Sequence, residues 1–521
     1  MSPATASQLA QAWARLPDYL GAHVTVSLCA LALGLIVSLP LALFARRRPG
    51  LRETLLGIAS IAQTVPGLAL LALFYPLLLA AASFTATWLG FSFSAFGFLP
   101  AVLALALYAM LPVMRNTITG LQGVNPELLE AAKGVGMTER QSLTLVELPL
   151  ALPTIMAGIR TAAVWVIGTA TLSTPIGQTS LGNYIFSGLQ TQNWIFVLFG
   201  CAASALLALA VDGALALIEN GMRHRRKPLR MLVGSVALLA IALLPLMGFA
   251  RPHAAYVVGA KTFTEQYILS ALIAERLRDA GLSAETRPGL GSSVIYEALR
   301  ASEIDVYVDY TGTLWANQFH LGPAPPRDEV LAILKQRLAQ SGITLLGKLG
   351  FENAYALVMP RARAAALNIH SIADLAAQSR AMSIAGDYEF FSRPEWAALT
   401  QDYGLAFRTE RQMQPDFMYA ALVAGEVDVI AGYTSDGAIA ADDLVVLSDP
   451  KRAIPPYDAI VLIAPRRAND QALRDALAPL LGKISLATMR DANRRAAEGG
   501  RSGSVEDIAA GILRSIAAPQ P

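Results

Sequence analysis

The sequence predicts an N-terminal all-α membrane domain of about six spans, followed by a C-terminal α/β domain. The length of 521 residues exceeds one compact domain. Apolar residues make up 54% of the chain and charged residues 15%, below the ~25% charged residues of typical soluble proteins. Only eight of the 39 acidic residues lie in residues 1–222. The later part alternates short aliphatic strands with helical stretches, as α/β folds do.

Six stretches are apolar enough to cross a bilayer, which takes about 20 residues. They are residues 24–44, 55–82, 98–114, 152–173, 194–217 and 231–250. The sixth contains no charged residue and is the strongest of these signals. The N-terminus lacks the charge pattern of a signal peptide, so we expect later parts to be exported by spans that stay in the membrane.

The basic residues between the spans predict the orientation of the chain. They follow the first, third and fifth spans: Arg46, Arg47, Arg48, Arg52; Arg115, Lys133, Arg140; Arg223, Arg225, Arg226, Lys227, Arg230. Residues 83–97 and 174–193 contain no Lys or Arg. Since loops rich in Lys and Arg stay in the cytoplasm, both the N-terminus and the long C-terminal part are expected outside.

Arg160 and Asp212 are ionisable groups within apolar stretches. Such groups often mark function, but both lie within about two turns of the predicted cytoplasmic end and can snorkel to the interface. Both interpretations remain open. Cys29 and Cys201 also lie in apolar stretches, where they are expected to be small apolar helix residues rather than a disulfide or metal site.

The composition argues against several functions. A net charge of +2 does not suit a general nucleic-acid binder. The five histidines are scattered, and no metal-ligand cluster or nucleophile–base set is visible in the sequence. We therefore expect neither an enzyme nor a bound cofactor or metal.

The loop between the third and fourth spans contains a spaced motif. Its residues are Glu130, Ala131, Ala132, Gly136 and the run Val146, Leu148, Pro149. The triplet, the glycine and the aliphatic-x-Leu-Pro ending resemble the EAA motif of ABC importer permeases. That resemblance implies a loop that docks on an ATPase subunit.

Local chemistry supports a helix in this loop. Asn125 is a good N-cap, Pro126 suits the first helical position, and Glu127 lies in the first turn. Gly134 and Gly136 are expected to end the helix and allow a sharp turn into a second one. The alternative is an ordinary amphipathic interfacial helix.

The chain carries no convincing ATP site. The nearest imitation of a phosphate-binding loop runs from Gly342 to Leu349, with leucine where Ser or Thr must bind magnesium. It also lies on the predicted outer side. The ATPase is therefore expected to be a separate polypeptide.

The C-terminal half contains an internal repeat. Residues 298–311 read ALRASEIDVYVDYT, and residues 421–434 read ALVAGEVDVIAGYT. Each predicts a helix end, a turn, a buried strand and a Tyr-Thr pair at the strand's carboxyl end, where ligands bind in open α/β sheets. We expect two equivalent units that present Tyr310 and Tyr433 to a shared cleft and close by a hinge.

This half resembles the binding proteins of glycine betaine/carnitine/choline importers. The resemblance rests on residues 259–266, 303–313, 389–394 and 432–437. It implies a periplasmic-binding-protein-like domain at 255–521, with lobe I at about 255–357 and 455–521 and lobe II at about 358–454. Residues 1–222 would form the permease, and 223–254 a basic cytoplasmic loop, a tether helix and a linker.

Relatives of this kind hold a quaternary ammonium group in a cage of aromatic rings through cation–π attraction, about 0.5–2 kcal/mol per ring. The candidate binding residues implied by the resemblance are Phe263, Thr264, Asp309, Tyr310, Thr311, Phe390, Arg393, Tyr419 and Tyr433. Asp309 would add charge attraction. Arg393 would either pair with a ligand carboxylate or hold its own turn together.

The resemblance implies a subunit of an ATP-driven importer in a bacterial plasma membrane, paired in a homodimer. Its solute would be cationic or zwitterionic: glycine betaine, choline or carnitine, or ergothioneine, which fused relatives import. The segment after residue 250 carries 27 basic and 31 acidic residues, which suits such a ligand weakly. The alternative is a membrane-tethered sensor without transport, although a sensor has no use for an ATPase-docking loop.

Overall fold

The structure is a computed structural model that describes residues 3–91, 93, 97–190, 193–223, 228–245, 255–321, 325–387, 390–413, 415–498 and 504–517. The chain divides into two compact units. The helical unit comprises Ala6–Gly188 and Trp194–His253. The α/β unit comprises Ala254–Pro521, with the short segments Met1–Thr5 and Leu189–Asn193.

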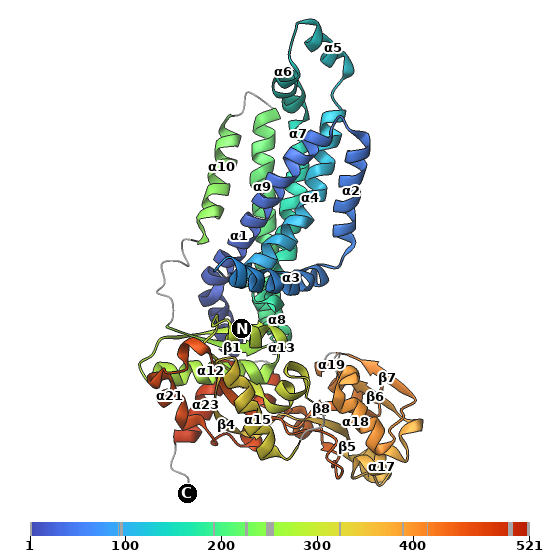
Figure 1. The fold of residues 1–521 in the computed structure, drawn as a ribbon, viewed down its shortest axis with the longest axis vertical. Helices are drawn as coiled ribbons and strands as arrows, with labels where there is room; N and C mark the ends of the chain where they lie inside the picture. The colour runs from blue at the N-terminus through green and yellow to red at the C-terminus, as the bar shows by residue number, and fades with distance from the viewer. Residues whose placement is uncertain are drawn as a thin grey trace. The chain divides into compact units, whose positions relative to one another are not determined.

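The helical unit combines long apolar helices with three short helices of four to nine residues (Figure 1). They are α1 (Pro3–Ala45), α2 (Pro49–Thr64), α3 (Gly67–Trp88), α4 (Phe98–Gln122), α5 (Pro126–Gly134), α6 (Glu139–Ser142), α7 (Leu148–Ala170), α8 (Gly182–Gln190), α9 (Trp194–Arg223) and α10 (Pro228–Leu243). Over the described residues, four helices are long and apolar enough to cross a membrane, or five if α2 and α3 form one bent span.

The stretch at residues 55–82, predicted as one span, is divided in the structure. Helices α2 and α3 are bent by 103° at the break between them. Pro66 explains the break, because its ring disfavours helical geometry at Val65, which is extended at φ −70° and ψ 127°. The sixth predicted span corresponds to α10, which packs against α9 through its buried residue Gly234. Its predicted end at 246–250 lies outside the described residues.

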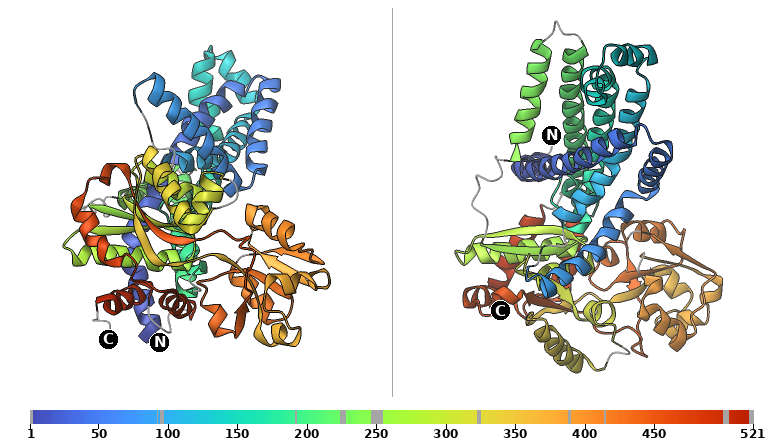
Figure 2. Two further views of the ribbon diagram at one scale, coloured as in Figure 1. Left: turned by 60° about the horizontal axis from the view of Figure 1, so that its bottom comes forward. Right: turned by 45° about the horizontal axis from the view of Figure 1, so that its top comes forward.

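The α/β unit contains two five-stranded sheets, visible as separate bodies in Figure 2. Sheet A has the order β2-β1-β3-β10-β4, and sheet B the order β7-β6-β8-β5-β9. The strands are β1 (Tyr256–Lys261), β2 (Ala284–Leu290), β3 (Val306–Tyr310), β4 (Thr344–Glu352), β5 (Tyr355–Pro360), β6 (Ser383–Gly386), β7 (Thr409–Gln412), β8 (Val429–Tyr433), β9 (Leu444–Val446) and β10 (Asp458–Ile463). We call the half built on sheet A lobe I and the half built on sheet B lobe II.

The two sheets share one topology. In each, the first three strands of the order are parallel, and the fourth, β10 or β5, is antiparallel to both neighbours. The chain crosses from sheet A to sheet B between Glu352 and Tyr355. This crossing lies a few residues before the boundary near 357 expected from the sequence, because β5 pairs with β8 from its first residue.

Helices cover the faces of both sheets. They are α12 (Thr264–Asp279), α13 (Ser292–Arg300), α14 (Thr311–Thr313), α15 (Arg327–Gln340), α16 (Arg361–Ala366), α17 (Ile372–Ala376), α18 (Pro394–Tyr403), α19 (Pro415–Val423), α20 (Ala438–Ala441), α21 (Gln471–Leu477), α22 (Leu486–Ala497) and α23 (Val505–Ala517). One apolar core runs over one face of each sheet, and separate cores cover the two opposite faces.

The repeat seen in the sequence has a structural counterpart. Helices α13 and α19 end before left-handed residues at equivalent positions, Ser302 at φ 61° and Gly425 at φ 74°. The strands β3 and β8 follow, each buried and each ending at its tyrosine. The predicted order of helix, turn, strand and Tyr-Thr is therefore confirmed.

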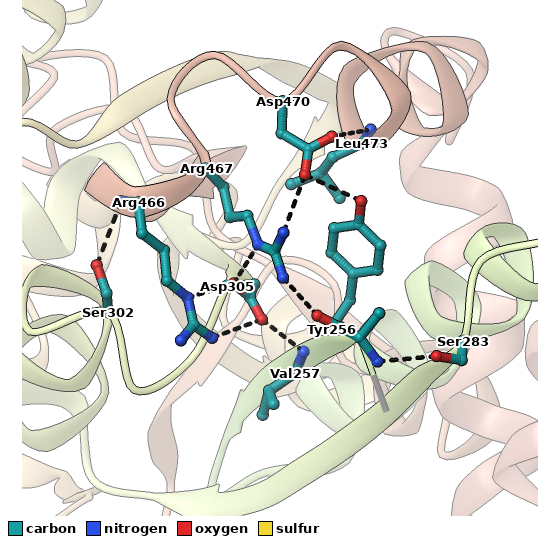
Figure 3. A network of polar contacts seen from close by, with 10 residues as sticks. Tyr256, Val257, Ser283, Ser302, Asp305, Arg466, Arg467, Asp470 and Leu473 are labelled. Atoms are coloured by element: carbon teal, nitrogen blue, oxygen red, sulfur yellow. Dashed lines mark hydrogen bonds and ion pairs between the residues drawn. The ribbon is translucent and has the colours of Figure 1, made fainter. Parts of the chain in front are cut away.

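An aspartate before each of these strands ties the sheet together. Asp305 accepts a hydrogen bond from the amide of Val257 in β1 at 2.8 Å, and Asp428 accepts one from Ser383 in β6 at 2.8 Å. Both aspartates also bind arginine from the helical turn after the fourth strand of the sheet. Figure 3 shows Arg466 and Arg467 around Asp305, and Arg363 lies 2.5 Å from Asp428.

Candidate functional site

In lobe I, two candidate aromatic residues are stacked. Phe263 follows β1 and is partly exposed, whereas Tyr310 at the end of β3 is buried. Their ring centroids are 6.2 Å apart and the ring planes differ by 30°. The exposed phenyl ring therefore rests on a buried tyrosine.

The hydroxyl of Tyr310 donates to the buried carboxylate of Glu265 at 2.5 Å. Asn353, in the crossing between the sheets, and Asn493 of α22 donate to the same carboxylate at 3.1 and 3.0 Å. Burial raises the pKa of Glu265, although these hydrogen bonds oppose the shift. Glu265 thus joins lobe I to the crossing segment directly, and to the turn after β8 through Asn493, which also donates to the carbonyl of Ser435 at 2.9 Å.

Asp309 points away from Tyr310, because successive residues of a strand face opposite sides. Its carboxylate accepts from Lys261 Nζ at 2.5 Å and from the hydroxyl of Tyr307 at 2.6 Å. Lys261 also lies 5.5 Å from the centroid of the Tyr310 ring. The charge of Asp309 is therefore matched by a lysine of the protein.

In lobe II, Tyr433 belongs to an aromatic cluster centred on Tyr355. The centroid of the Tyr355 ring lies 4.8 Å from that of Tyr433, 5.1 Å from that of Phe390 and 6.1 Å from that of Tyr457. Phe390 has no exposed surface, whereas Tyr433 is partly exposed. Of the four residues in this cluster, Tyr433 is thus the one that is partly exposed.

A buried carboxylate also supports this cluster. Asp387, directly after β6, accepts from the hydroxyls of Tyr433 and Tyr355, the second at 2.9 Å. Its other oxygen accepts from the amide of Phe390 at 2.8 Å. Each lobe therefore pairs its strand-end tyrosine with a carboxylate from the segment after its first parallel strand.

Arg393 is buried within its own turn. Its guanidinium donates to Glu395 at 3.3 Å and to the hydroxyl of Tyr457 at 2.8 Å, and Tyr457 donates to Glu395. Its Cζ lies 5.1 Å from the centroid of the Tyr355 ring. Of the two roles considered for Arg393, these contacts match holding the turn.

The remaining candidates are distributed around the strand ends. Tyr419 lies on the face of sheet B opposite Tyr433, and its hydroxyl donates to Asp436 at 2.5 Å. The hydroxyl of Thr311 donates to the carbonyl of Pro456 at 2.8 Å. Thr264, the first residue of α12, is partly exposed. Glu389, part of a matched segment, lies outside the described residues.

The sequence did not single out Tyr355, Tyr457, Asp387, Lys261 or Glu265. Tyr355 begins β5, and because β5 is antiparallel to β8, its first residue pairs with Tyr433, the last residue of β8. The alternation of residues along β5 would place Tyr355 beside Tyr433 only if the order of the strands in the sheet were already known.

The loop between α4 and α7 has the predicted helix–turn–helix shape. The Asn125 side chain accepts from the amide of Glu127 at 3.0 Å, α5 ends at Gly134, and Gly136 is left-handed at φ 80°. The α5 and α6 helices project beyond the ends of the long helices of their unit (Figure 1). Glu130, Ala131 and Gly136 are exposed and Ala132 is buried.

This loop is tied at its base to the end of α1. Glu147 is buried and lies 3.6 Å from Arg46, and Arg47 pairs with Glu139 of α6. Deeper in the unit, Arg160 of α7 makes a bidentate pair with Asp212 of α9, with both distances 2.9 Å, and a further bond to Glu219 at 2.9 Å. Arg160 and Asp212 therefore neutralise each other between two helices.

The described residues contain no group of three or more His, Cys, Asp or Glu placed to hold a metal ion.

Comparison with known proteins gives matches to both units. Residues 254–515 match the family described as the substrate binding domain of ABC-type glycine betaine transport system. Residues 30–224 match the binding-protein-dependent transport system inner membrane component.

Individual relatives are transport proteins. The chain is 29% identical over 477 residues to the ergothioneine transport permease/ergothioneine binding protein EgtU of Helicobacter pylori (strain G27), covering 88% of this chain and 83% of the relative. It is 44% identical over 198 residues to the choline transport system permease protein OpuBB of Bacillus subtilis (strain 168), covering 38% of this chain and 84% of the relative. The glycine betaine/carnitine/choline permease OpuCB of the same organism is 42% identical over 200 residues, covering 38% and 85%.

These matches cover the apolar helices and the two-lobed unit in turn. The chain is a membrane-bound transporter subunit rather than an enzyme, and ATP hydrolysis belongs to a separate subunit. It belongs to the ABC-type glycine betaine transport family, as an importer permease fused to its own substrate-binding domain.

Proposed function

We propose that the α/β unit binds a quaternary-ammonium solute between its lobes and delivers it to the permease. The solute is of the glycine betaine, choline or carnitine type, or ergothioneine. The observation that carries this proposal is the pair of partly exposed rings, Phe263 and Tyr433, each resting on a buried tyrosine at the strand ends. A trimethylammonium group donates no hydrogen bond, so aromatic faces are its natural partners.

The other candidates take supporting roles in this site. Tyr310, Phe390 and Arg393 hold the rings in place from behind, and Thr264 and Thr311 lie at the strand ends beside them. Asp309 and Tyr419 contribute to the surrounding field and packing, since each faces the other side of its sheet. Truncating a ring that faces the ligand should weaken binding more than truncating one of these two.

The test is titration calorimetry of the full-length chain in nanodiscs with glycine betaine, choline, carnitine and ergothioneine. Saturable binding of at least one amine is expected, and Tyr433→Ala should weaken it by about 2- to 30-fold, the equivalent of one cation–π contact. Absence of binding to all four amines would refute the proposed ligand class.

The loop around Glu130, Ala131, Ala132 and Gly136 is proposed to dock on the ATPase. Because Gly136 is left-handed at φ 80°, a β-branched side chain there is strained. Gly136→Val should abolish uptake in cells yet leave amine binding intact. Gly134→Ala is the matched control, because no atom lies within 4 Å of the added Cβ. Loss of binding in Gly136→Val would contradict this division of labour.

The assembly is proposed to be a homodimer in a bacterial plasma membrane, with the α/β unit outside the cytoplasm. The basic loops support this orientation, and a permease of this family needs two membrane halves.

Protease added to spheroplasts should digest the α/β unit while the α5–α6 loop stays protected. An ATPase should co-purify in gentle detergent, and its absence would favour a tethered sensor.

A further inference from the structure

The two exposed rings differ in one respect. Phe263 has no hydroxyl, and the buried Tyr310 behind it donates to Glu265 instead. Tyr433 has a hydroxyl of its own, which donates directly to Asp387. Of these two partly exposed residues, therefore, only Tyr433 in lobe II bonds to a carboxylate.

Asp387 is well placed to act on this ring. It is 8% exposed and accepts from two phenol groups and one backbone amide, so its position is constrained from three directions. Burial first, and then the nearby Tyr355 and Asp387, raise the pKa of Tyr433 well above its ordinary value. Tyr433 thus keeps its proton at neutral pH and remains a donor.

A phenol that donates to a carboxylate gains electron density on its ring, because hydrogen-bonded groups polarise one another. The ring face then attracts a cation more strongly, and the attraction is larger in a partly buried site than in water. The same polarisation does not strengthen the binding of a neutral group of the same shape.

The buried tyrosines already have cations of the protein beside them. Lys261 Nζ lies 5.5 Å from the Tyr310 ring centroid, and Arg393 Cζ lies 5.1 Å from that of Tyr355. Among the described residues, no Lys or Arg side chain lies over the Tyr433 ring in this way. The polarised face of Tyr433 is the one that a ligand cation can meet.

We propose that Asp387 is a positioning residue that sets the preference for a cationic over a neutral solute, acting through the hydroxyl of Tyr433. This role depends on the quaternary-ammonium binding proposed above. The chemical class it selects is a trimethylammonium head group, whatever the rest of the solute.

The test compares each trimethylammonium solute with the isostere in which a neutral tert-butyl group replaces the trimethylammonium group, on the full-length chain in nanodiscs. The pairs are choline with 3,3-dimethylbutan-1-ol, and glycine betaine with 3,3-dimethylbutanoate. Asp387→Asn should weaken the cation by up to about threefold, because the ring remains and only its polarisation, about 10–30% of one cation–π contact, is lost, and should leave the isostere unchanged. Tyr433→Phe should do the same, and the double variant should be no worse than the stronger single variant.

The matched control comes from lobe I. Glu265→Gln alters the carboxylate behind the buried Tyr310, so it should change both members of a pair by the same factor. Asp387→Glu, which keeps the charge, should retain more discrimination than Asp387→Asn. If Asp387→Asn does not fold, as judged by thermal unfolding, Tyr433→Phe carries the test.

Equal loss of cation and isostere in Asp387→Asn would overturn the role, as would additive losses in the double variant. If ergothioneine is the one amine that binds, the double-variant comparison is made with ergothioneine, and additivity there overturns the role. A wild-type chain that binds none of the four amines refutes the proposed function itself, which is a different outcome.

Discussion

Lobes I and II solve the same structural problem with the same parts, yet they present different groups to solvent. In both, a strand-end tyrosine donates its hydroxyl to a carboxylate, Tyr310 to Glu265 and Tyr433 to Asp387. In lobe I that tyrosine is buried behind Phe263, whereas in lobe II it is itself partly exposed.

The shared parts belong to the fold. The aspartates before β3 and β8 bind the neighbouring strand and an arginine in both lobes, and in each lobe the chain passes through a left-handed residue before the aspartate. What differs lies at the ring that faces solvent. The comparison teaches that the duplicated elements stabilise the lobes, while the departures from duplication lie at the proposed binding site.

The largest expected effect is the loss of protein stability when either of these two aspartates is replaced. Asp305 is fully buried and accepts from Arg466, Arg467 and Val257. Asp305→Ala should cost about 2–4 kcal/mol of unfolding free energy, because several donors lose their partner. Asp428→Ala should cost about 1–2 kcal/mol, since the Asp428 side chain is 15% exposed and pairs with Arg363, whereas Asp305 is fully buried and pairs with two arginines. Pulse proteolysis in urea measures both, and equal losses would break the comparison.

The next effect separates the two tyrosines. Tyr310→Phe removes a donor from the buried Glu265 and should cost about 1–2 kcal/mol of stability, with equal effects on cationic and neutral ligands. Tyr433→Phe should cost less stability, because Tyr355 still donates to Asp387, but should reduce cation affinity selectively. Unfolding curves measure the stability loss and calorimetry the ligand affinities of both variants. A larger stability loss in Tyr433→Phe, or a selective loss of cation affinity in Tyr310→Phe, would contradict the roles given to the two tyrosines.

A smaller effect is expected from pH. Because the pKa of Glu265 is raised by burial, its stabilising contribution is complete below its unfolded pKa of about 4.3 and is lost as pH rises through the folded pKa. At Asp305 burial also acts to raise the pKa, but the hydrogen bonds with Arg466 and Arg467 outweigh it, so the pKa of Asp305 lies below its ordinary value. Its contribution is therefore present above about 3.9 and is lost as pH falls through the folded pKa.

The two carboxylates should thus respond to pH with opposite sign. The stability lost in Glu265→Gln should shrink between pH 4.5 and 8, whereas the loss in Asp305→Asn should be full across that range. Melting temperatures of the two variants against wild type at each pH test this directly. The same slope for both variants would show that burial does not dominate at Glu265.

The smallest effect is expected from making lobe I resemble lobe II. Phe263→Tyr adds a hydroxyl to the exposed ring, but Glu265 already accepts from Tyr310, Asn353 and Asn493. Affinity should change by less than about threefold, because the new hydroxyl finds no free carboxylate to polarise it. A tenfold gain in choline or betaine affinity would show that the lobes are interchangeable.

Much of the fold was predictable because its signals are local. Apolar length, the basic loops and the internal repeat predicted a helical unit and two equivalent α/β halves, and the Asn125 cap with Gly134 and Gly136 predicted the projecting loop. The division of residues 55–82 at Pro66 was missed, since a proline within an apolar stretch is compatible with either a kinked helix or a break.

The candidate site was less predictable because it depends on strand order and facing. Tyr433 and Tyr310 follow from the repeat, but Tyr355 joins them only because β5 runs antiparallel beside β8. Tyr419 faces the opposite side of sheet B. Asp387 accepts from two tyrosines that are 32 and 46 residues away in sequence, which spacing alone does not reveal.

The sequence by itself determined the two classes of structure, the loop with its EAA spacing and the duplicated strand-end tyrosines, because composition, periodicity and capping act over a few neighbouring residues. Only the tertiary structure decided which aromatic rings face solvent, which are buried, and which carboxylate supports each ring. Those outcomes depend on side chains brought together from distant strands, where burial and hydrogen-bond partners are set by packing rather than by position in the chain.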